Sequence, residues 1–200
     1  MTSPKLPDAM RTTEFFRLLH AFQAVERATV VPDLSRKEND IEHSYLLTML
    51  CWYLANTLDL ALDTKKLIEY ALVHDFIEVY AGDTYFLDAE ALRSKHEREE
   101  ASRLRIATEF PEFTDMHERI AQYEKREDPE ARFVYEVDKL IPLMTNYTQD
   151  GFGWKQYNVQ PDELFANKRE RIQDHPEVRS ILEQFILELD TRRSEFFNQK

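Results

Sequence analysis

The stretch "ALVHDFIEVYAGDT", residues 71–84, decides the fold, because it combines the apolar pattern of a buried helix with three polar residues in its middle. Its apolar residues recur at the spacing of a helix that faces a core. His74, Asp75 and Glu78 interrupt that face. Burying an imidazole and two carboxylates without partners costs several kcal/mol. The sequence therefore predicts a helical interior in which some other group compensates these three side chains.

The composition is typical of one globular domain, with 42% hydrophobic and 32% charged residues in a chain of 200. The formal net charge of -12 argues against nucleic acid or an anionic membrane as a partner. Cys51 is the only cysteine and lies in the apolar run "LTMLCWYLA", so we expect it in the core of a protein from a reducing, cytoplasmic compartment. The start "MTSPKLPDAM" has no basic segment followed by an apolar run, so we expect no signal peptide, and no stretch reaches the ~20 apolar residues of a membrane span.

Glycine is scarce, and its placement excludes several common phosphate-binding sites. The three glycines, Gly82, Gly151 and Gly153, open neither a GxGxxG nor a GxxxxGK[ST] motif. No serine lies in a GxSxG motif either. The usual dinucleotide, P-loop and serine-hydrolase sites are therefore excluded.

Almost every segment has helical periodicity, which predicts an all-α fold of about seven or eight helices around one core. No alternating run of β-branched residues indicates a sheet, and "QDGFGWKQYN", residues 149–158, is the clearest loop. We expect one domain over residues 11–200, after a flexible segment 1–10. The expected helices are 12–28, 41–60, 64–80, 88–109, 112–126, 129–149, 161–173 and 176–197. The inward stripe expected within 41–60 consists of Leu46, Leu47, Leu50, Tyr53, Leu54, Thr57 and Leu58.

Polar residues interrupt apolar helical faces at three distant places, His43, His74–Asp75 and Asp138. A lone buried histidine is usually a hydrogen-bonded core residue, and a lone aspartate often caps a helix or pairs with arginine. Two imidazoles and two carboxylates that converge in one core are instead a candidate site for a divalent cation. Nitrogen and oxygen ligands without a thiolate favour Mn, Fe, Co, Ni or Zn over a soft metal.

This H…HD…D pattern resembles the HD-domain superfamily of metal-dependent phosphohydrolases. The blocks "NDIEHSY", "ALVHDFIEVYAGDT", "REEASRL", "YEKREDPEARFVYEVDKLIPLMTNY" and "GFGW" are similar to its branch related to the 5'-deoxynucleotidases, over roughly residues 15–160. The resemblance implies a helical HD domain that removes phosphate from nucleoside 5'-monophosphates. It also implies one divalent metal ion, which could be Mn, Co, Fe, Ni, Zn or Mg, and a homodimer.

The resemblance further assigns roles to residues around the metal ligands. Glu78 follows the His74–Asp75 pair by one helical turn, and by resemblance it orients or deprotonates the attacking water; an exposed helix carboxylate is the alternative. Such an ion would lower the pKa of a water molecule and neutralise charge on the phosphoryl group. The spare histidines give no second metal site, so we expect one ion. They are His20, His96, His117 and His175.

By resemblance, Arg27 at the end of the first helix grips the substrate phosphate, a task that suits a guanidinium fork. Arg17 could compete for that role, and a surface salt bridge is the alternative for Arg27. Asp83, after Gly82, contacts the sugar or assists the leaving oxygen by resemblance; in the alternative it caps backbone amides in a turn.

Two departures from the family pattern limit what the resemblance implies about the sugar and base. Ala28 follows Arg27 where the nucleotidases often have a large aromatic residue, and "TYFLD", residues 84–88, replaces their proline- and threonine-containing turn. Other readings are hydrolysis of another small phosphate ester or a nucleoside triphosphate, a nucleotide-sensing module without turnover, and a purely structural dimerisation scaffold. The spacing of Lys37, Lys65 and Lys139 gives no sign of a polyphosphate clamp.

Overall fold

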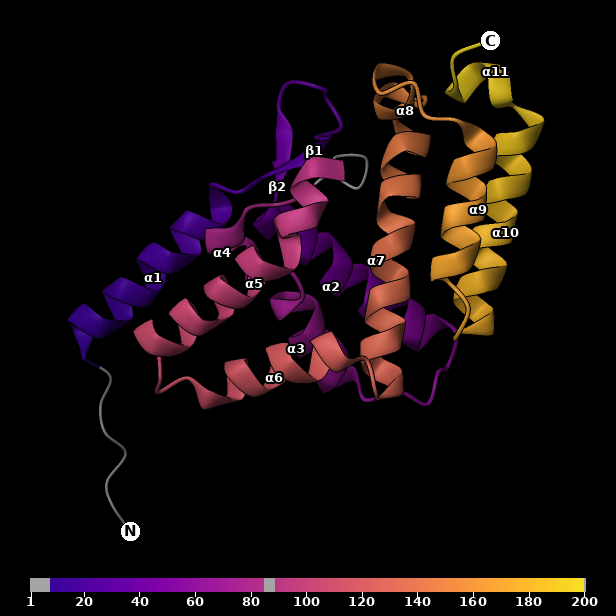
Figure 1. Cartoon of the computed structure of the whole chain (residues 1–200). Coiled ribbons are helices and arrows are strands. Elements are labelled where there is room, and N and C mark those ends of the chain that lie inside the picture. The colour runs from indigo at the N-terminus through magenta and orange to yellow at the C-terminus, as the bar shows by residue number, and fades with distance from the viewer. Residues whose placement is uncertain (1–7, 85–88, 200) are drawn as a thin grey trace.

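The computed structural model describes residues 8–84 and 89–199 and is built almost entirely from helices (Figure 1). In these residues, eight helices have ten or more residues, which confirms the all-α prediction. The longer helices are α1 (Ala9–Gln23), α2 (Asp40–Thr57), α3 (Thr64–Val73), α5 (Ala89–Glu109), α6 (Thr114–Lys125), α7 (Pro129–Thr148), α9 (Pro161–Arg171) and α10 (Pro176–Thr191). The shorter elements are β1 (Glu26–Val30), β2 (Lys37–Asn39), α4 (Glu78–Ala81), α8 (Phe152–Gln156) and α11 (Arg193–Phe196).

Local sequence signals set where the long helices begin. Asn39 accepts a hydrogen bond from the backbone N–H of Glu42, and the Glu42 side chain accepts one from the backbone of Asn39, which forms a capping box at the start of α2. Asp63 and Asp128 cap α3 and α7 in the same sense, by accepting from backbone N–H groups of the first turn. These caps fix the starts of three helices, and two of them carry predicted metal ligands, His43 on α2 and Asp138 on α7.

A short antiparallel hairpin, β1–β2, is the first departure from the predicted fold, since no sheet was expected. Glu26 pairs with Asn39 and Val30 with Lys37. The first helix ends at Gln23, so Arg27 lies on a strand and not at the end of a helix. Two short strands can satisfy their backbone groups by hydrogen bonding to each other, without the alternation of apolar and polar residues that marks a longer sheet in a sequence.

The predicted helix 64–80 is interrupted, and the interruption contains the key residues. Helix α3 stops at Val73 and α4 starts at Glu78, so His74 lies in the turn between them. Two side chains of α5 hold this region: Ser102 donates to the carbonyl of Ile77, and Arg98 donates to the carbonyl of Ala81. Tertiary hydrogen bonds from α5 therefore support this turn in addition to its local backbone hydrogen bonds.

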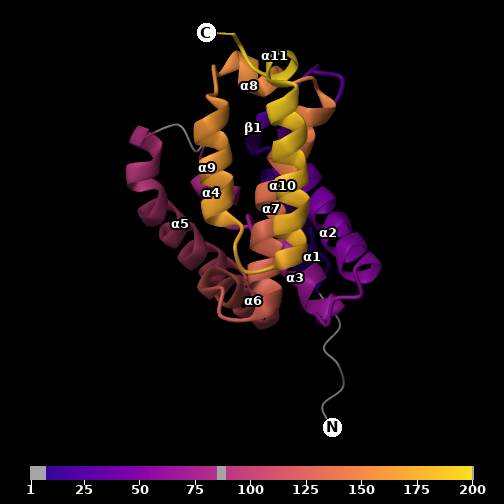
Figure 2. The same cartoon turned by 90° about the vertical axis from the view of Figure 1, so that its right-hand side faces the viewer.

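Helix α7 crosses the middle of the molecule, with α1 and α5 on one side and α9 and α10 on the other (Figures 1 and 2). Most core residues form one cluster around α2, α3, α7, α9 and α10, and a second cluster joins α1, α4, α5 and α6. Cys51 is fully buried, as predicted. The stripe predicted on α2 is partly wrong, because Leu46, Tyr53 and Leu58 are exposed while Leu47 and Leu54 are buried.

The predicted loop 149–158 is also wrong in part, because Phe152–Gln156 forms α8. Asn146 of α7 explains the turn, since its Oδ1 accepts from the backbone N–H of Trp154 at 3.2 Å. Gly151 precedes α8 with φ 72°, and a Cβ there would lie 2.0 Å from the carbonyl oxygen of Phe196, so only glycine fits. In the described part of the chain, every helix is too short or too polar to span a membrane.

Candidate metal centre

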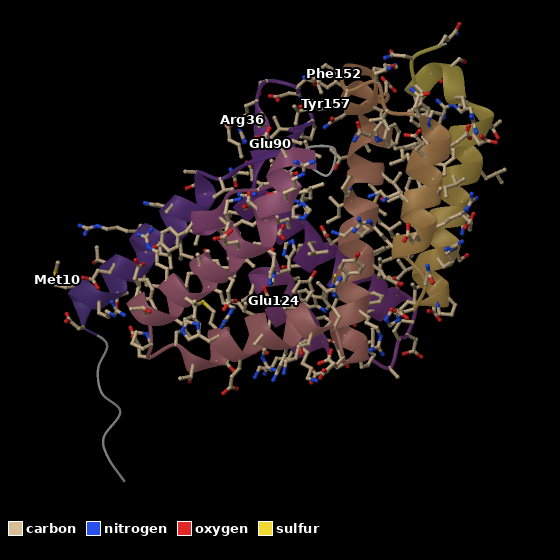
Figure 3. All side chains as sticks on the ribbon, in the orientation of Figure 1. Met10, Arg36, Glu90, Glu124, Phe152 and Tyr157 are labelled. Carbon is tan, nitrogen blue, oxygen red and sulfur yellow. The ribbon has the colours of Figure 1, made fainter. Side chains whose placement is uncertain are left out.

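A cavity of about 720 Å³ lies beside the turn between α3 and α4. Its walls come from β1, this turn, α4, α5, α6, α7, α8 and α9, and they include six of the seven predicted site residues. Those six are Arg27, His74, Asp75, Glu78, Asp83 and Asp138. Figure 3 labels two further lining residues, Glu124 near α6 and Tyr157 near α8.

Three of the four predicted metal ligands lie together, and the fourth contacts one of them, although they come from α2, the α3–α4 turn and α7. Ligand atoms of His43, His74 and Asp75 all lie within 4.8 Å of one another. Asp138 joins them through its Oδ1, 2.9 Å from Nε2 of His43. His43 is almost fully buried, and burial lowers the pKa of its imidazole, which favours the neutral form that binds metals.

The tautomer of His74 suits a metal ligand. Its Nδ1 lies 2.9 Å from the carbonyl of Ala71, which can only accept, so Nδ1 carries the proton. Nε2 has no aligned hydrogen-bond partner, although it lies 2.8 Å from Oδ2 of Asp75. Burial disfavours a charged ring, but Asp75 outweighs it and raises the pKa of His74, so a positive charge between these two atoms is favoured. A proton or a divalent cation on Nε2 supplies that charge, and the donor set therefore fits a metal ion.

Neighbouring cations set the ionisation of the two carboxyl groups among the predicted ligands, Asp75 and Asp138. Burial disfavours ionisation of Asp75, but His74 and Arg27 outweigh it and hold the pKa of that carboxyl below its usual range. Burial disfavours ionisation of Asp138 too, and Lys139, 2.5 Å away, again lowers its pKa. Both candidate ligand carboxylates are therefore ionised at neutral pH and available to a cation.

Glu78 lies at the same site, but its carboxyl group is held in the protonated, neutral form. Burial, then the charges of Asp75 and Asp83, raise its pKa to about 10. Its Oε2 is buried without a hydrogen-bond partner, and Oε1 lies 3.5 Å from Nζ of Lys95. A buried carboxyl group whose pKa is raised this far is typical of functional sites. A positive charge bound beside it lowers the pKa and favours the ionised form.

Arg27 reaches the site from β1. One terminal nitrogen, Nη1, donates to Asp40 at 2.8 Å and to Asp75 at 2.6 Å. Arg17, its predicted competitor, is exposed on α1 and lines a different surface depression with Tyr80 and Glu109. Of the two arginines, only Arg27 is beside the predicted ligands.

Asp83 lines the cavity directly after Gly82, whose φ of 75° ends α4 and turns the chain. The charge of Asp83 contributes to the raised pKa values of Glu78 and Asp40. Four of the five residues of "TYFLD", 85–88, lie outside the described residues.

Sequence reasoning missed several charged residues that the fold brings to this site. Asp40 is fully buried, and burial raises its pKa to about 7 despite Arg27. Its position three residues before His43 places it on the same helical face, a signal that was available in the sequence. Lys95 and Lys168 come from distant helices, and only the tertiary fold brings them into the cavity wall.

Comparison with known proteins agrees with this arrangement. The family model for the HD domain matches residues 19–179. The chain belongs to the HD-domain family. A human relative of this HD-domain protein, 5'-deoxynucleotidase HDDC2, is 26% identical over 184 residues, which cover 90% of this chain and 85% of the human protein. The 5'-deoxynucleotidase hdd1 of Schizosaccharomyces pombe is 24% identical over 166 residues, with 78% of each chain covered.

A solved structure extends the comparison to three dimensions. The predicted metal-dependent phosphohydrolase from Magnetospirillum magnetotacticum MS-1 superimposes with a TM-score of 0.78 and 27% identity, covering 94% of this chain and 95% of that one. The HD-domain match and this neighbour indicate a divalent metal ion, and His43, His74 and Asp75 offer ligand groups for it.

Proposed function

We propose that this HD-domain protein is a metal-dependent phosphomonoesterase that removes phosphate from nucleoside 5'-monophosphates. The observation that carries the proposal is the buried cluster of His43, His74, Asp75 and Asp138 at a cavity that also contains Arg27. The names of the human and yeast relatives support the same substrate class.

One divalent ion would be held by His43, His74, Asp75 and Asp138. When bound, such an ion supplies positive charge that polarises a phosphoryl oxygen and lowers the pKa of water. A second acidic group, Asp40 with Asp75 and Glu78, is close enough to hold a cation. The guanidinium of Arg27 already bridges Asp40 and Asp75, which favours one ion over two.

Glu78 would orient the attacking water and accept its proton. Its unpartnered Oε2 is free to accept a hydrogen bond, and proton transfer of this kind needs a carboxylate within hydrogen-bond reach. Arg27 would hold the substrate phosphate: within the described residues its Nη2 has no hydrogen-bond partner, so a donor remains for a phosphate oxygen. Asp83 would contact the sugar or assist the leaving oxygen from the cavity wall.

The test is phosphate release from a panel of ribo- and deoxyribonucleoside 5'-monophosphates. Protein stripped with a chelator is resupplied with Mn, Co, Zn, Mg or no metal. We expect release that depends on the metal, and the panel then gives the sugar and base preference. Tight binding of one equivalent of metal without release from any monophosphate would overturn the proposal and favour a nucleotide sensor or another phosphate ester.

We also infer a cytoplasmic homodimer. Apolar side chains crowd the solvent-facing side of α2, where Tyr53 is 62% exposed and Trp52 46%. Ile41, Tyr45, Leu46 and Met49 continue the same exposed surface. A second copy of the chain would bury it through a two-fold interface. Sedimentation should give a dimer for the native chain and a monomer for Trp52→Glu, whereas a monomeric native chain would overturn the inference.

A further inference from the structure

A second group of charged side chains lines the same cavity, and all of them are positive. They are Arg126 at the end of α6, Lys139 on α7, and Lys168 and Arg171 on α9. We call these residues the basic cluster. The cluster is unusual because the chain as a whole carries a formal net charge of -12.

The cluster begins at the candidate metal centre and extends away from it over one aromatic ring. Nζ of Lys139 lies 2.5 Å from Asp138 and 4.9 Å from the ring centre of Tyr135. The guanidinium of Arg126 lies 4.4 Å from the same ring centre, and Arg171 donates to the Tyr135 hydroxyl at 3.3 Å. Tyr135 thus holds three cations in position close to the predicted ligands.

Most of these charges lack a carboxylate partner. In the described part of the chain, Arg126, Lys168 and Arg171 make no ion pair, whereas arginines such as Arg119 and Arg192 elsewhere on the surface do. Like charges grouped without counterions raise the free energy of the protein until an anion binds. The cluster therefore carries positive charge that only a bound anion would offset.

Lys168 is the clearest case. It is only 8% exposed, and its one hydrogen bond, at 2.8 Å, goes to the backbone carbonyl of Lys139. Burial, and then the neighbouring ammonium of Lys139, lower its pKa to about 7. The free side chain is therefore only partly protonated at neutral pH. A bound anion would favour the ammonium form, in which two of the three donors remain for the ligand.

We propose that the basic cluster binds a second phosphate group of the substrate, other than the phosphate at the metal centre. The inference rests on the proposed function, in which the first phosphate lies between the metal ligands and Arg27. In the reaction, water forms a new bond to the 5'-phosphorus and the bond from phosphorus to the 5'-oxygen breaks. The 5'-oxygen takes a proton. In a nucleoside 3',5'-bisphosphate the second phosphate stays on the nucleoside, and in a nucleotide with a 5'-polyphosphate chain it leaves with the released polyphosphate.

The experiment measures binding by calorimetry, with Glu78→Gln as the background to prevent turnover. The probes are deoxyadenosine 5'-monophosphate, 3',5'-bisphosphate and 5'-triphosphate, each with the metal that supports activity. We expect the bisphosphate or the triphosphate to bind about 10- to 100-fold more tightly than the monophosphate, because each added contact is a charge-assisted hydrogen bond. Whichever is preferred identifies the source of the second phosphate.

Lys168→Met and Arg171→Met should each reduce this ratio of affinities about tenfold, and added salt should reduce it in the parent protein. Methionine fills the space of the buried lysine, and Arg171 is exposed, so both variants are expected to fold. Lys65→Met is the matched control, since Lys65 is exposed on α3 and pairs with Glu69. Its ratio should not change.

Equal affinities for all three probes would overturn the inference, and so would a ratio that Lys168→Met and Arg171→Met leave intact. Phosphate release by the native protein separates this result from the proposed function. Release from a monophosphate without any preference for a second phosphate would leave the function standing and remove the subsite. A preference that depends on the cluster, without release from any probe, would keep the subsite and remove the function.

Discussion

Glu136 and Glu78 are both almost fully buried carboxylic acids, with exposed fractions of 1% and 3%, but their surroundings differ completely. Glu136 on α7 accepts three backbone hydrogen bonds from the turn between α9 and α10. The donors are the N–H groups of Gln173 at 2.5 Å, Asp174 at 2.6 Å and His175 at 3.1 Å. Glu78 has an unpartnered oxygen and faces other carboxylates.

The difference separates a structural charge from a functional one. Three aligned donors offset the desolvation of Glu136, so the protein alone completes that site. At Glu78 the protein leaves the compensation unfinished, and the nearby Asp75 and Asp83 increase the cost of ionisation. Incomplete compensation of a buried group indicates that a ligand or a reaction supplies the rest.

The largest effect should come from Glu78→Gln. Because the amide cannot accept a proton from water, we expect kcat to fall about 10²- to 10⁴-fold. The free energy of unfolding should stay the same or rise, since a neutral group replaces a carboxyl that other carboxylates repel. Glu124→Gln, on the wall of the same cavity, is the control and should retain its activity. A Glu78→Gln variant with native turnover would contradict the assigned role.

Glu136→Ala should have the reverse profile. It leaves three backbone N–H groups without their acceptor, and we expect a loss of about 3 kcal/mol in the free energy of unfolding. Among folded molecules kcat should be close to native. Urea unfolding measures the loss, with Glu170→Ala, exposed on α9, as the control. If Glu136→Ala abolished turnover but not stability, the contrast between the two glutamates would be lost.

The long helices were predictable because periodicity and local capping determine them. Residues 88–109 and 129–149 differ from α5 and α7 by one residue at a single end. The break at His74 was not predictable, since hydrogen bonds from Ser102 and Arg98 on another helix stabilise it. The hairpin that carries Arg27 was not predictable for the same reason. The side-chain amide of Gln149, at the end of α7, donates to the carbonyl oxygen of the last residue of β1 at 2.9 Å.

On α2 the prediction failed for a different reason. Apolar residues occur all around this helix, so periodicity alone could not tell the core side of Leu47 from the solvent side of Leu46. The division into a flexible segment 1–10 and a domain 11–200 stays a prediction, although α1 already begins at Ala9.

The candidate site divides in the same way. His43, His74, Asp75 and Asp138 could be found because a polar residue on an apolar helical face stands out in the sequence. Lys168 could not, because "ELFANKRER" is charged and looks like an ordinary solvated helix. Only the packing of α9 against α7 makes that lysine a buried residue beside Lys139.

Removal of the metal should lower stability through the candidate metal centre beside Glu78, and this loss should not depend on Glu136. A ligand present at about 100 times its Kd adds about 2.7 kcal/mol to the free energy of unfolding. We therefore expect a chelator to lower Tm for the native chain and for Glu136→Ala alike. His74→Asn should lose this shift, and His175→Asn, a matched change at the start of α10, should keep it. A His74→Asn variant that kept the full shift would exclude His74 as a ligand.

The smallest effect concerns Lys168, the cationic counterpart of Glu78. Its folded pKa of about 7 lies below the ordinary lysine value of 10.5, so between these values the unfolded chain binds more protons and stability rises with pH. From about pH 7 to about pH 8 the native chain should gain about 1 kcal/mol relative to Lys168→Met, which has no ammonium to discharge. Urea unfolding of both proteins at both pH values measures the difference, because all other titrating groups are shared. Parallel pH profiles would mean that Lys168 stays charged in the fold and is compensated as fully as Glu136.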